Sequence, residues 1–504
     1  MVFILFVIVS ALIVLLLLTN KKKYKNLPPG PYPWPIIGNV IEMAMIDIKY
    51  PHKALEKLSR KYGEIMKIQF GAHFMIVISS YEVMKEMLTK PEANIGRFVF
   101  PFVPDRAYGN PNRGIIFNSG ESWQELKRYT IRTLRDFGFG KKNSMNGVMQ
   151  EEVDELMSTI KGGVLDGLGE WEVDPHLLAS SAINVLWSLV AGYRFSLEDK
   201  NLQEAVRLND DILFACGLSN RYTAFPWVKT LFPKLSKHEE HLKCYAEMQK
   251  FLRRIIKDIQ EKRSARSNQD AESYIEAFLD EIEKRKGTGD TNFTDDQLIV
   301  VLADLFLAGS ETTSTSVNWM LYHLAMNGHV QEKVYDEICR VIGSDVTPTL
   351  DNEKSLVYMK ATLYEMFRMS DIVPTPPPRI LTDSITVRGY TLPKGAGVMY
   401  NMDPVLTDKV HWGDPDVFRP ERFLSTNDDG TMQLVNTERV ASFGFGKRLC
   451  LGETLAWNTV FLYVTNIFQT FKLSTIPGKM PPMEPINSAT LSPDRYSLHF
   501  ELRK

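Results

Sequence analysis

The chain has 504 residues, of which 44% are hydrophobic and 24% are charged, so its composition excludes an intrinsically disordered or fibrous protein. Its formal net charge of −2 at pH 7 gives no indication of a nucleic acid or an acidic polymer as partner. A length of 504 residues would suggest about three domains at roughly 150 residues each, unless no linker divides the chain.

The N-terminal segment is strongly apolar. Residues 1–18 carry no charged side chain, and lysines follow at positions 21–23 and 25. Because a helix of about 20 apolar residues spans a bilayer, we predict a transmembrane signal anchor over residues 1–20. The lysines that follow it predict a lumenal N-terminus and a cytosolic body. A cleaved signal peptide is the alternative, but this segment has no positively charged start and no small-residue cleavage site.

A proline-rich segment follows the predicted anchor. Residues 27–35 read Leu-Pro-Pro-Gly-Pro-Tyr-Pro-Trp-Pro. Proline restricts φ and stiffens an extended chain, so we predict a basic and proline-rich hinge over residues 21–39. The same composition is also typical of a ligand for a proline-binding module.

The remaining chain shows mainly helical periodicity. Two short alternating runs around Gly71–Ala72 predict a β-hairpin over residues 64–80. The pattern predicts helices over residues 81–88, 122–135, 147–161, 176–190, 239–266, 271–286 and 295–326, and strands near 380–391 and 496–501. Thr294 and Gln297 have the spacing of a capping box at the start of the longest helix. The longest polar break, residues 284–296, is too short for an interdomain linker. We therefore predict a mainly α fold with small β-sheets, in one large domain over residues 40–504.

One of the four cysteines lies in a distinctive loop. Residues 443–452 read Phe-Gly-Phe-Gly-Lys-Arg-Leu-Cys-Leu-Gly, directly before a predicted helix. A cysteine at a helix N-terminus favours the thiolate, and glycines allow the backbone to approach a flat ligand. Arg448 offers a cation to an acidic group. The loop predicts that Cys450 has a lowered pKa and lies beside a planar anionic ligand, the alternative being a tight turn with an incidental cysteine. Cys216, Cys244 and Cys339 are expected to be reduced and buried.

The loop resembles the heme-binding signature of the cytochrome P450 family, phenylalanine-x-x-glycine-x-arginine-x-cysteine-x-glycine, at every specified position. Three more segments resemble family motifs in the expected order. Residues 308–313 resemble the oxygen-binding stretch, 365–368 the glutamate-x-x-arginine pair, and 415–423 the proline-glutamate-arginine-phenylalanine segment. The similarity runs from about Leu27 to the C-terminus and is greatest to the microsomal animal branch, including arthropod members. It implies the cytochrome P450 fold, with heme b as the cofactor.

The resemblance implies that Cys450 is the thiolate ligand of the heme iron, to which it donates electron density. The residues of the same loop that it places around the heme are Phe443, Gly446 and Gly452.

The resemblance also implies cations for the two heme propionates. Arg448, Arg379 and Trp123 lie at family positions for this contact. Where the family usually has arginine, this chain has Lys127, which keeps the charge but loses the forked geometry. Arg128 is the alternative contact.

Two catalytic residues are adjacent in the oxygen-binding stretch. Glu311 and Thr312 pair a carboxylic acid with an alcohol, which can relay protons to an oxygen site on the same helix. Gly309 would weaken that helix where oxygen must fit. The alternative for Gly309 and Thr312 is ordinary helix packing.

A second motif predicts a structural charge cluster. Glu365 and Arg368 are three residues apart and share a helix face. By resemblance, Arg422 completes a buried cluster that braces the heme loop. Buried ion networks fix geometry more than they add stability, so we interpret this cluster as structural.

The substrate class follows from residues at family lining positions. An apolar pocket suits a lipophilic molecule, such as a xenobiotic, a steroid or a terpenoid hormone precursor. The alternative for these side chains is plain core packing. They are Phe98, Phe100, Ala303, Leu307, Ile372 and Val373.

The resemblance implies NADPH–cytochrome P450 reductase as the electron donor, with cytochrome b5 as a second candidate, at the endoplasmic reticulum membrane. This donor fits the absence of a G-x-G-x-x-G nucleotide-binding motif from the sequence. A basic run is either a docking surface for an acidic donor protein or a solvated face. Its members are Lys127, Arg128, Arg132, Arg135, Lys141 and Lys142.

The leading hypothesis is a heme-thiolate monooxygenase that hydroxylates or epoxidises a lipophilic substrate. One rival is a heme-thiolate isomerase or dehydratase, which needs neither dioxygen nor a reductase. The other is a non-catalytic heme-binding sensor or carrier. The retained pair of Glu311 and Thr312 favours the monooxygenase.

Overall fold

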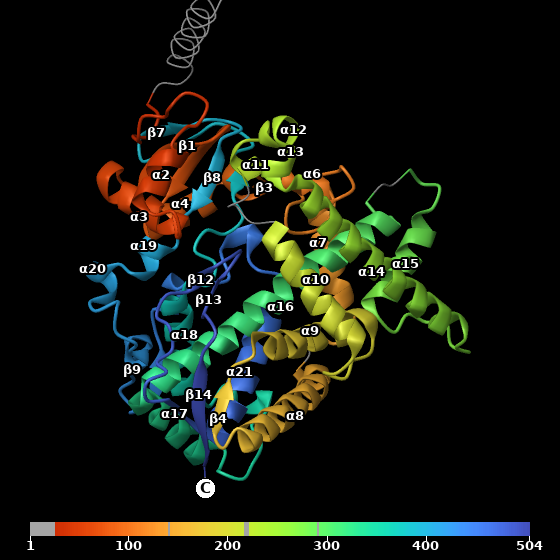
Figure 1. Ribbon diagram of the computed structural model, residues 1–504, viewed down its shortest axis with the longest axis vertical. Helices are drawn as coiled ribbons and strands as arrows, with labels where there is room; N and C mark the ends of the chain where they lie inside the picture. The colour runs from red at the N-terminus through yellow and green to blue at the C-terminus, as the bar shows by residue number, and fades with distance from the viewer. Residues whose placement is uncertain (1–25, 140–141, 216–220, 290–291, 504) are drawn as a thin grey trace, which may run out of the picture.

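The computed structural model describes residues 26–139, 142–215, 221–289 and 292–503. The predicted transmembrane anchor, the first part of the predicted hinge and Cys216 lie outside the described residues. The described chain is mainly helical with several small sheets, as predicted (Figure 1).

All the helices that periodicity predicts are present, and most of their ends differ from the predicted ones by a few residues. The short 3₁₀ helices are η2 (Leu350–Asn352), η3 (Pro420–Phe423), η4 (Thr437–Arg439) and η5 (Gly446–Arg448). The α-helices are α2 (Val40–Ile46), α3 (Pro51–Tyr62), α4 (Tyr81–Leu88), α5 (Pro91–Asn94), α6 (Phe102–Arg106), α7 (Gly120–Asp136), α8 (Lys142–Asp166), α9 (Pro175–Ala191), α10 (Lys200–Ala215), α11 (Arg221–Ala224), α12 (Val228–Leu231), α13 (Pro233–Ser236), α14 (His238–Ser264), α15 (Tyr274–Arg285), α16 (Asp295–Met326), α17 (Gly328–Val341), α18 (Val357–Ser370), α19 (Asp403–Leu406), α20 (Lys409–Trp412) and α21 (Glu453–Thr470).

The strands of the described residues form five small sheets. They are β1 (Ile65–Phe70), β2 (His73–Ile78), β3 (Gly96–Arg97), β4 (Glu170–Glu172), β5 (Arg379–Ile380), β6 (Ile385–Val387), β7 (Tyr390–Leu392), β8 (Gly397–Tyr400), β9 (Leu424–Thr426), β10 (Met432–Leu434), β11 (Phe471–Thr475), β12 (Ile486–Asn487), β13 (Leu491–Ser492) and β14 (Ser497–Leu502).

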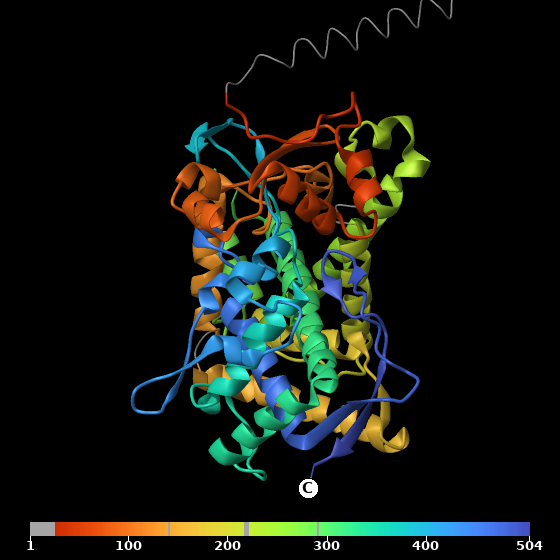
Figure 2. The same cartoon turned by 90° about the vertical axis from the view of Figure 1, so that its left-hand side faces the viewer.

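Helix α16 is the central element of the core and packs against α9, α14, α18 and α21 (Figure 2). Among the described residues it is the one helix long and apolar enough to span a membrane, but 61% of its most apolar stretch is buried inside the protein. It is therefore a core helix. Its predicted capping box is only half formed: the Thr294 hydroxyl accepts from the Gln297 N–H at 3.1 Å. The Gln297 side chain instead accepts from the Gly114 N–H at 3.4 Å.

The largest sheet has the strand order β1-β2-β8-β5-β3. Its β1–β2 hairpin is the one that the sequence predicts. Strand β8 pairs with β2 in parallel, and β5 pairs antiparallel with both β8 and β3. In the β3–β5 pair Arg97 lies directly opposite Arg379, which brings two cations from distant parts of the chain to one place.

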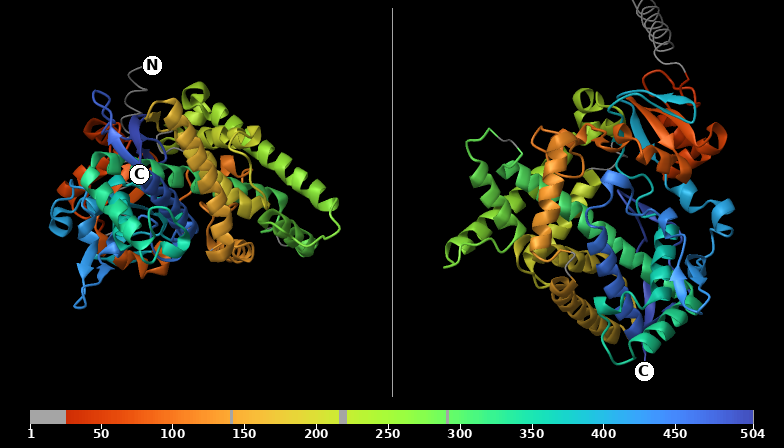
Figure 3. Two further views of the ribbon diagram at one scale, coloured as in Figure 1. Left: turned by 90° about the horizontal axis from the view of Figure 1, so that it is seen from below. Right: turned by 180° about the vertical axis from the view of Figure 1, so that it is seen from behind.

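The large sheet and the sheet formed by β11, β14 and β4 lie at opposite ends of the molecule (Figure 1, Figure 3). Between them, the β12–β13 hairpin packs against α16. The Trp319 indole N–H of α16 donates to the Leu491 carbonyl of this hairpin at 2.8 Å. The hairpin is thereby fixed beside the C-terminal half of the central helix.

Candidate active site

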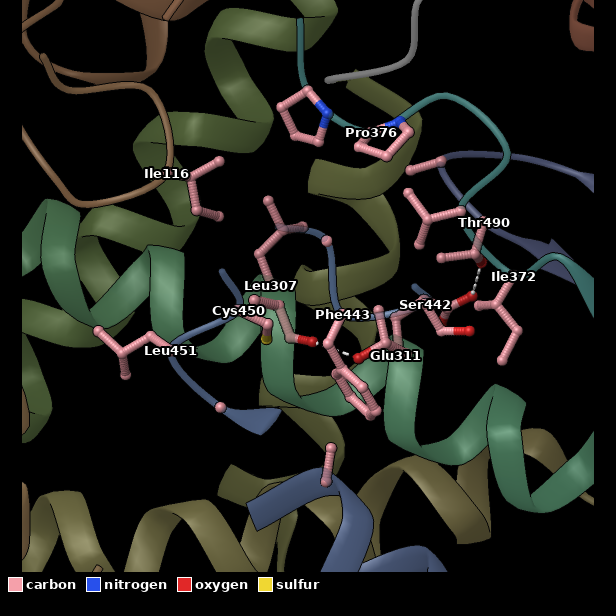
Figure 4. A pocket seen from close by; sticks show the side chains of 18 of the residues that line it. Ile116, Leu307, Glu311, Ile372, Pro376, Ser442, Phe443, Cys450, Leu451 and Thr490 are labelled. Carbon is pink, nitrogen blue, oxygen red and sulfur yellow. Dashed lines mark hydrogen bonds between the residues drawn. The ribbon is translucent and has the colours of Figure 1, made fainter. Parts of the chain in front are cut away.

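A cavity of about 530 Å³ lies between α16, the loop before α21 and the segment after α18. Its walls include Leu307, Ala308 and Thr312 of α16 and, from the loop, Phe443 and Cys450 (Figure 4). A cavity of this size, with mainly apolar walls and a few polar groups, is typical of a small-molecule or cofactor site.

The loop that carries Cys450 reverses direction through glycines. Gly444 and Gly446 adopt φ values of 76° and 63°, which side chains with a Cβ rarely tolerate. The Cys450 N–H then donates to the Phe443 carbonyl at 2.9 Å, which closes the loop. The Cys450 thiol opens into the cavity and not onto the outer surface of the protein. Gly452 also lines the cavity, whereas Gly446 shapes the loop behind it.

The prediction of a lowered pKa for Cys450 is wrong. Burial raises the pKa of this thiol, while the N–H groups of Gly452 and Glu453 oppose the rise. Desolvation outweighs these two donors because the sulfur faces an apolar cavity. A thiol of this kind ionises when it coordinates a metal ion.

Three guanidinium groups line one side of the cavity, and we name Arg97, Arg379 and Arg448 the arginine cluster. Arg97 donates to the carbonyls of Ile116 at 3.0 Å and Pro377 at 2.5 Å. Arg448 donates to the carbonyl of Asn118 at 2.6 Å and lies 3.5 Å from the centre of the Trp123 ring. In the part of the chain that the structure describes, neither Arg97 nor Arg448 forms an ion pair with a carboxylate.

The charges of the arginine cluster disfavour one another. Burial first, and then the neighbouring guanidinium groups, lower the pKa of both Arg97 and Arg448. Because arginine stays protonated in proteins, these lowered pKa values express the cost of holding the charges together. An anionic ligand would remove that cost. Arg97 is absent from the propionate contacts that the sequence predicts, because only the β3–β5 register places it here.

Tyr400 adds a neutral donor to the same wall. Its ring lies 5.1 Å from the Arg379 guanidinium, and its residue lines the cavity. Its hydroxyl is buried and has no hydrogen-bond partner among the described residues. Because buried hydroxyls are nearly always hydrogen-bonded, this group marks the place of an external acceptor. A ligand with two carboxylates fits these donors, and heme b has two propionates; the residues present therefore fit the cofactor that the sequence predicts.

The structure distinguishes between the two candidate contacts on α7. Lys127 lines the cavity, and its ammonium donates to the Lys447 carbonyl at 2.6 Å. Burial and the nearby Arg448 lower the pKa of Lys127. Arg128 is exposed on the outer side of α7, where it lines a shallow hollow with Arg132 and Arg135. Lys127, and not Arg128, therefore faces the cavity.

The acid and the alcohol of α16 both line the cavity but have separate partners. The Thr312 hydroxyl donates to the Ala308 carbonyl at 2.6 Å. The Glu311 carboxylate accepts from the Thr490 hydroxyl at 2.9 Å (Figure 4). Burial raises the pKa of Glu311, which favours the protonated form of this carboxyl. Gly309 also packs closely against α9, since a Cβ at this position would lie 3.0 Å from the Leu186 side chain.

The predicted charge cluster forms behind the cavity, and we name Glu365, Arg368 and Arg422 the brace cluster. Arg368 makes two hydrogen bonds to the Glu365 carboxylate, at 2.7 and 2.9 Å, and Arg422 makes one at 2.9 Å. Both guanidinium groups also donate to backbone carbonyls, including that of Leu406 from Arg368 at 2.8 Å and that of Trp412 from Arg422 at 2.6 Å. The cluster joins α18 to the segment that precedes the cysteine loop.

The predicted substrate-lining residues divide into two groups. Phe100, Leu307, Ile372 and Val373 line the cavity. Phe98 lies outside the lining and packs against Phe100 with ring centres 4.9 Å apart. Ala303 is also outside it and packs against the main core. For these two residues the core-packing alternative is correct, because the direction of a side chain depends on contacts that local periodicity does not specify.

One buried acid in the wall has no counterpart in the sequence-based prediction. Asp304 is 1% exposed and accepts from the backbone N–H groups of Ile115 at 2.6 Å and Ile116 at 3.0 Å. It also forms an ion pair with Arg106. Asp304 therefore fastens the loop before α7 to the central helix, and Ile116 of that loop reaches the cavity.

Comparisons with known proteins agree with this geometry. The cytochrome P450 family model matches residues 28–500. Cytochrome P450 2J2 of Homo sapiens is 32% identical over 455 residues, which cover 90% of this chain and 86% of the human protein. Cytochrome P450 2C28 of Mesocricetus auratus is 34% identical over 466 residues, 90% of this chain and 89% of the relative. Farnesoate epoxidase of Bombyx mori is 31% identical over 482 residues, 95% of this chain and 94% of the relative.

Proposed function

The chain belongs to the cytochrome P450 family, and from this premise we propose a role for each part of the site. The chain is a cytochrome P450 monooxygenase, and its cofactor is heme b, held through a cysteine thiolate. When bound, the heme activates dioxygen, so that one oxygen atom enters the substrate and the other is reduced to water.

We assign the thiolate to Cys450, the one described cysteine that lines the cavity. The propionates would be held by the arginine cluster, with Trp123, Lys127 and Tyr400 beside it. Phe443 and Gly452 would border the cofactor, and the brace cluster would fix the segment before the cysteine loop. This assignment is supported by the convergence of one thiol and several cations on a single cavity.

The proton relay is assigned to α16. The Glu311 carboxyl holds a proton in a buried place, and the Thr312 hydroxyl passes a proton on toward the cavity centre. Both side chains line the same cavity as Cys450, and this convergence is the observation that carries the proposal. An intact acid and alcohol favour the monooxygenase over an isomerase, a dehydratase or a heme-binding sensor.

The substrate is proposed to be a lipophilic small molecule that is hydroxylated or epoxidised. Leu307, Ile372, Val373 and Phe100 provide an apolar wall for it. The name of the Bombyx mori relative describes epoxidation of farnesoate, which favours a terpenoid hormone precursor among the candidate classes. A steroid or a xenobiotic is the alternative.

Electrons are proposed to come from NADPH–cytochrome P450 reductase, with cytochrome b5 as a second donor. Arg128, Arg132 and Arg135 form a basic group on the outer side of α7, whose inner side carries Trp123 and Lys127 at the cavity. A basic surface of this kind favours docking of an acidic protein.

The enzyme is proposed to lie on the endoplasmic reticulum membrane, with the predicted anchor spanning it. Large exposed apolar side chains support this location, because they gather on α2, on the chain just before and after it and on the segment from α11 to α13. These elements lie at the end of the molecule where the described chain begins (Figure 1). The residues are Tyr32, Trp34, Ile36, Ile41, Met45, Ile48, Trp227, Leu231, Phe232 and Leu235.

The cysteine assignment is tested by a carbon-monoxide difference spectrum of the reduced, heme-loaded protein. The wild type is expected to give the red-shifted Soret band of thiolate-ligated heme, and Cys450→Ala is expected to lose it. A wild-type spectrum without this band, from a folded and heme-loaded preparation, would refute the assignment.

The reaction class is tested by turnover under ¹⁸O₂ with reductase and NADPH. A monooxygenase incorporates one labelled atom into the product, whereas an isomerase or dehydratase works without dioxygen. The probe compounds would come from a spin-shift screen of terpenoids, steroids and fatty acids.

A further inference from the structure

We propose that Thr490 is a positioning residue for the proton relay, because its hydroxyl holds the Glu311 carboxylate against the β12–β13 hairpin. The wall that contacts the substrate would then also set the orientation of the acid. This inference rests on the relay role proposed above for Glu311.

The contact joins two distant parts of the chain. Thr490 lies in the hairpin between β12 and β13, 179 residues beyond Glu311, and its hydroxyl is 2.9 Å from Glu311 Oε1. Within α16, the Thr315 hydroxyl lies 3.5 Å from the same oxygen, at the limit of a hydrogen bond. Thr490 is therefore the stronger described partner of this carboxylate.

The hairpin is fixed independently of Glu311. The Leu491 carbonyl accepts from Trp319 at 2.8 Å, and the Leu491 N–H donates to the Ile372 carbonyl at 2.9 Å. Thr490 itself is 4% exposed. Because the hairpin has its own attachments to α16 and to the segment after α18, removing one hydroxyl would leave it in place. The carboxylate would then be the group that moves.

The same hairpin is part of the cavity wall. Ser488, Ala489 and Thr490 line the cavity together with Ile372 and Glu311 (Figure 4). A molecule that presses on the hairpin therefore acts on a residue that holds the acid. This arrangement links occupancy of the pocket to the geometry of proton delivery.

The hydrogen bond also affects the protonation of the acid. Burial raises the pKa of Glu311, and the Thr490 bond opposes this rise because it stabilises the carboxylate. The charged groups that act on Glu311 from neighbouring helices are Asp210 of α10, which raises its pKa, and His176 of α9, which lowers it. Loss of the Thr490 hydroxyl is therefore expected to extend the protonated form to higher pH.

The test compares Thr490→Val, which keeps the shape but removes the hydroxyl, with Thr490→Ser, which retains it. Both are made in the full-length, heme-loaded protein, with Thr315→Val as the matched control. Infrared titration follows the protonated carboxyl band of Glu311, identified by its loss in Glu311→Gln. The midpoint is expected to rise by about one pH unit or more in Thr490→Val and to stay near the wild-type value in the other two variants.

A second measurement reports the relay itself. With reductase and NADPH and without added substrate, the hydrogen peroxide released per NADPH consumed is expected to rise in Thr490→Val and to return toward the wild-type ratio in Thr490→Ser. The carbon-monoxide spectrum is expected to be unchanged in both variants. It serves as the check that the heme site is intact.

The outcomes separate the two proposals. An unchanged infrared midpoint in Thr490→Val overturns the positioning role, and so does a shifted midpoint with an unchanged peroxide ratio. If Glu311→Gln leaves the peroxide ratio unchanged, the relay role of Glu311 itself is wrong, whatever the infrared titration of Thr490→Val shows.

Discussion

The brace cluster and the arginine cluster both concentrate buried guanidinium groups, yet they satisfy them differently. In the brace cluster, Arg368 and Arg422 share the Glu365 carboxylate and complete their hydrogen bonds with backbone carbonyls. In the arginine cluster, Arg97 and Arg448 donate to backbone carbonyls and not to a carboxylate among the described residues, and burial together with the neighbouring guanidinium groups lowers the pKa of both. A charge network whose carboxylate comes from the chain itself stabilises the fold. A network that keeps an excess of positive charge is suited to bind an anionic ligand.

The largest expected effect is the loss of the brace. Arg368→Ala would leave the Glu365 carboxylate buried without its main partner, at a cost of about 3–5 kcal/mol. We expect little folded, heme-loaded protein, measured by chemical unfolding and by the carbon-monoxide spectrum. The control is Arg419→Ala, which removes a half-exposed ion pair with Asp414 and should cost about 0–1 kcal/mol. Equal losses in the two variants would contradict the structural role of the brace cluster.

The second effect in size is a loss of stability in acid, which comes from His323 beside the brace cluster. His323 stacks on Phe418 with ring centres 4.8 Å apart, and burial together with the charge of Arg368 lowers its pKa to about 3. The unfolded chain therefore binds more protons than the folded chain between pH 6.5 and about 3. His323 contributes stability that is complete above pH 6.5 and falls by roughly 1.4 kcal/mol per pH unit below it.

This acid effect is measured by unfolding between pH 7 and pH 5. His323→Gln should make the stability curve less steep in this range by roughly 1.4 kcal/mol per pH unit, because other buried histidines such as His52, whose pKa burial lowers to about 4, still contribute. The control is replacement of the exposed His329 by Gln. A curve that keeps its slope in His323→Gln would assign the acid sensitivity to other groups.

Loss of a cation from the arginine cluster should cost the heme-free protein much less than loss of the brace. Arg97→Ala removes a repulsive charge from the heme-free protein but also the hydrogen bonds to the Ile116 and Pro377 carbonyls, so its unfolding free energy should change little. The heme-loaded protein should lose a charged hydrogen-bond donor worth about 1.5–3 kcal/mol, which corresponds to heme release about 10- to 100-fold faster. The measurement is heme transfer to apomyoglobin, with Arg97→Lys as an intermediate variant that keeps the charge. Faster unfolding of both forms would show that Arg97 belongs to the fold and not to the ligand site.

The smallest predicted effect concerns Tyr400, the neutral donor beside the arginine cluster. Tyr400→Phe removes only a hydroxyl, and a neutral hydrogen bond contributes about 1 kcal/mol. Heme release should therefore become about fivefold faster, while the heme-free protein keeps its stability. Identical release rates would mean that the Tyr400 hydroxyl does not contact the cofactor.

Features that depend on neighbouring residues in the chain could be predicted from the sequence. Helix α16 has the predicted bounds because its cap at Thr294 and its apolar periodicity are local. The cysteine loop could be predicted because its glycines, arginine and cysteine are close in sequence. Glu365 and Arg368 meet because residues three apart share a helix face.

Features that depend on pairing across the chain could not be predicted. The parallel contact of β2 with β8 and the β3–β5 register join segments that are far apart in sequence, so the sequence alone does not place Arg97 in the arginine cluster. The Thr490–Glu311 contact has the same origin. The prediction of a lowered pKa for Cys450 fails for a different reason. The place of the cysteine before a helix can be read from the sequence, but its desolvation in a cavity cannot.

Asp304 attaches a loop of the cavity wall to the central helix in a way that allows a side chain of that loop to vary. It fastens the loop at Ile115 and Ile116 by their backbone N–H groups, so the attachment does not depend on which side chains the loop carries. Ile116 lines the cavity and is only partly buried, so its side chain can vary on a fixed backbone, whereas Ile115 and Phe117 also pack in the hydrophobic core. A library randomised at position 116, with Asp304 retained, should yield enzymes with altered substrate preference and little change in stability.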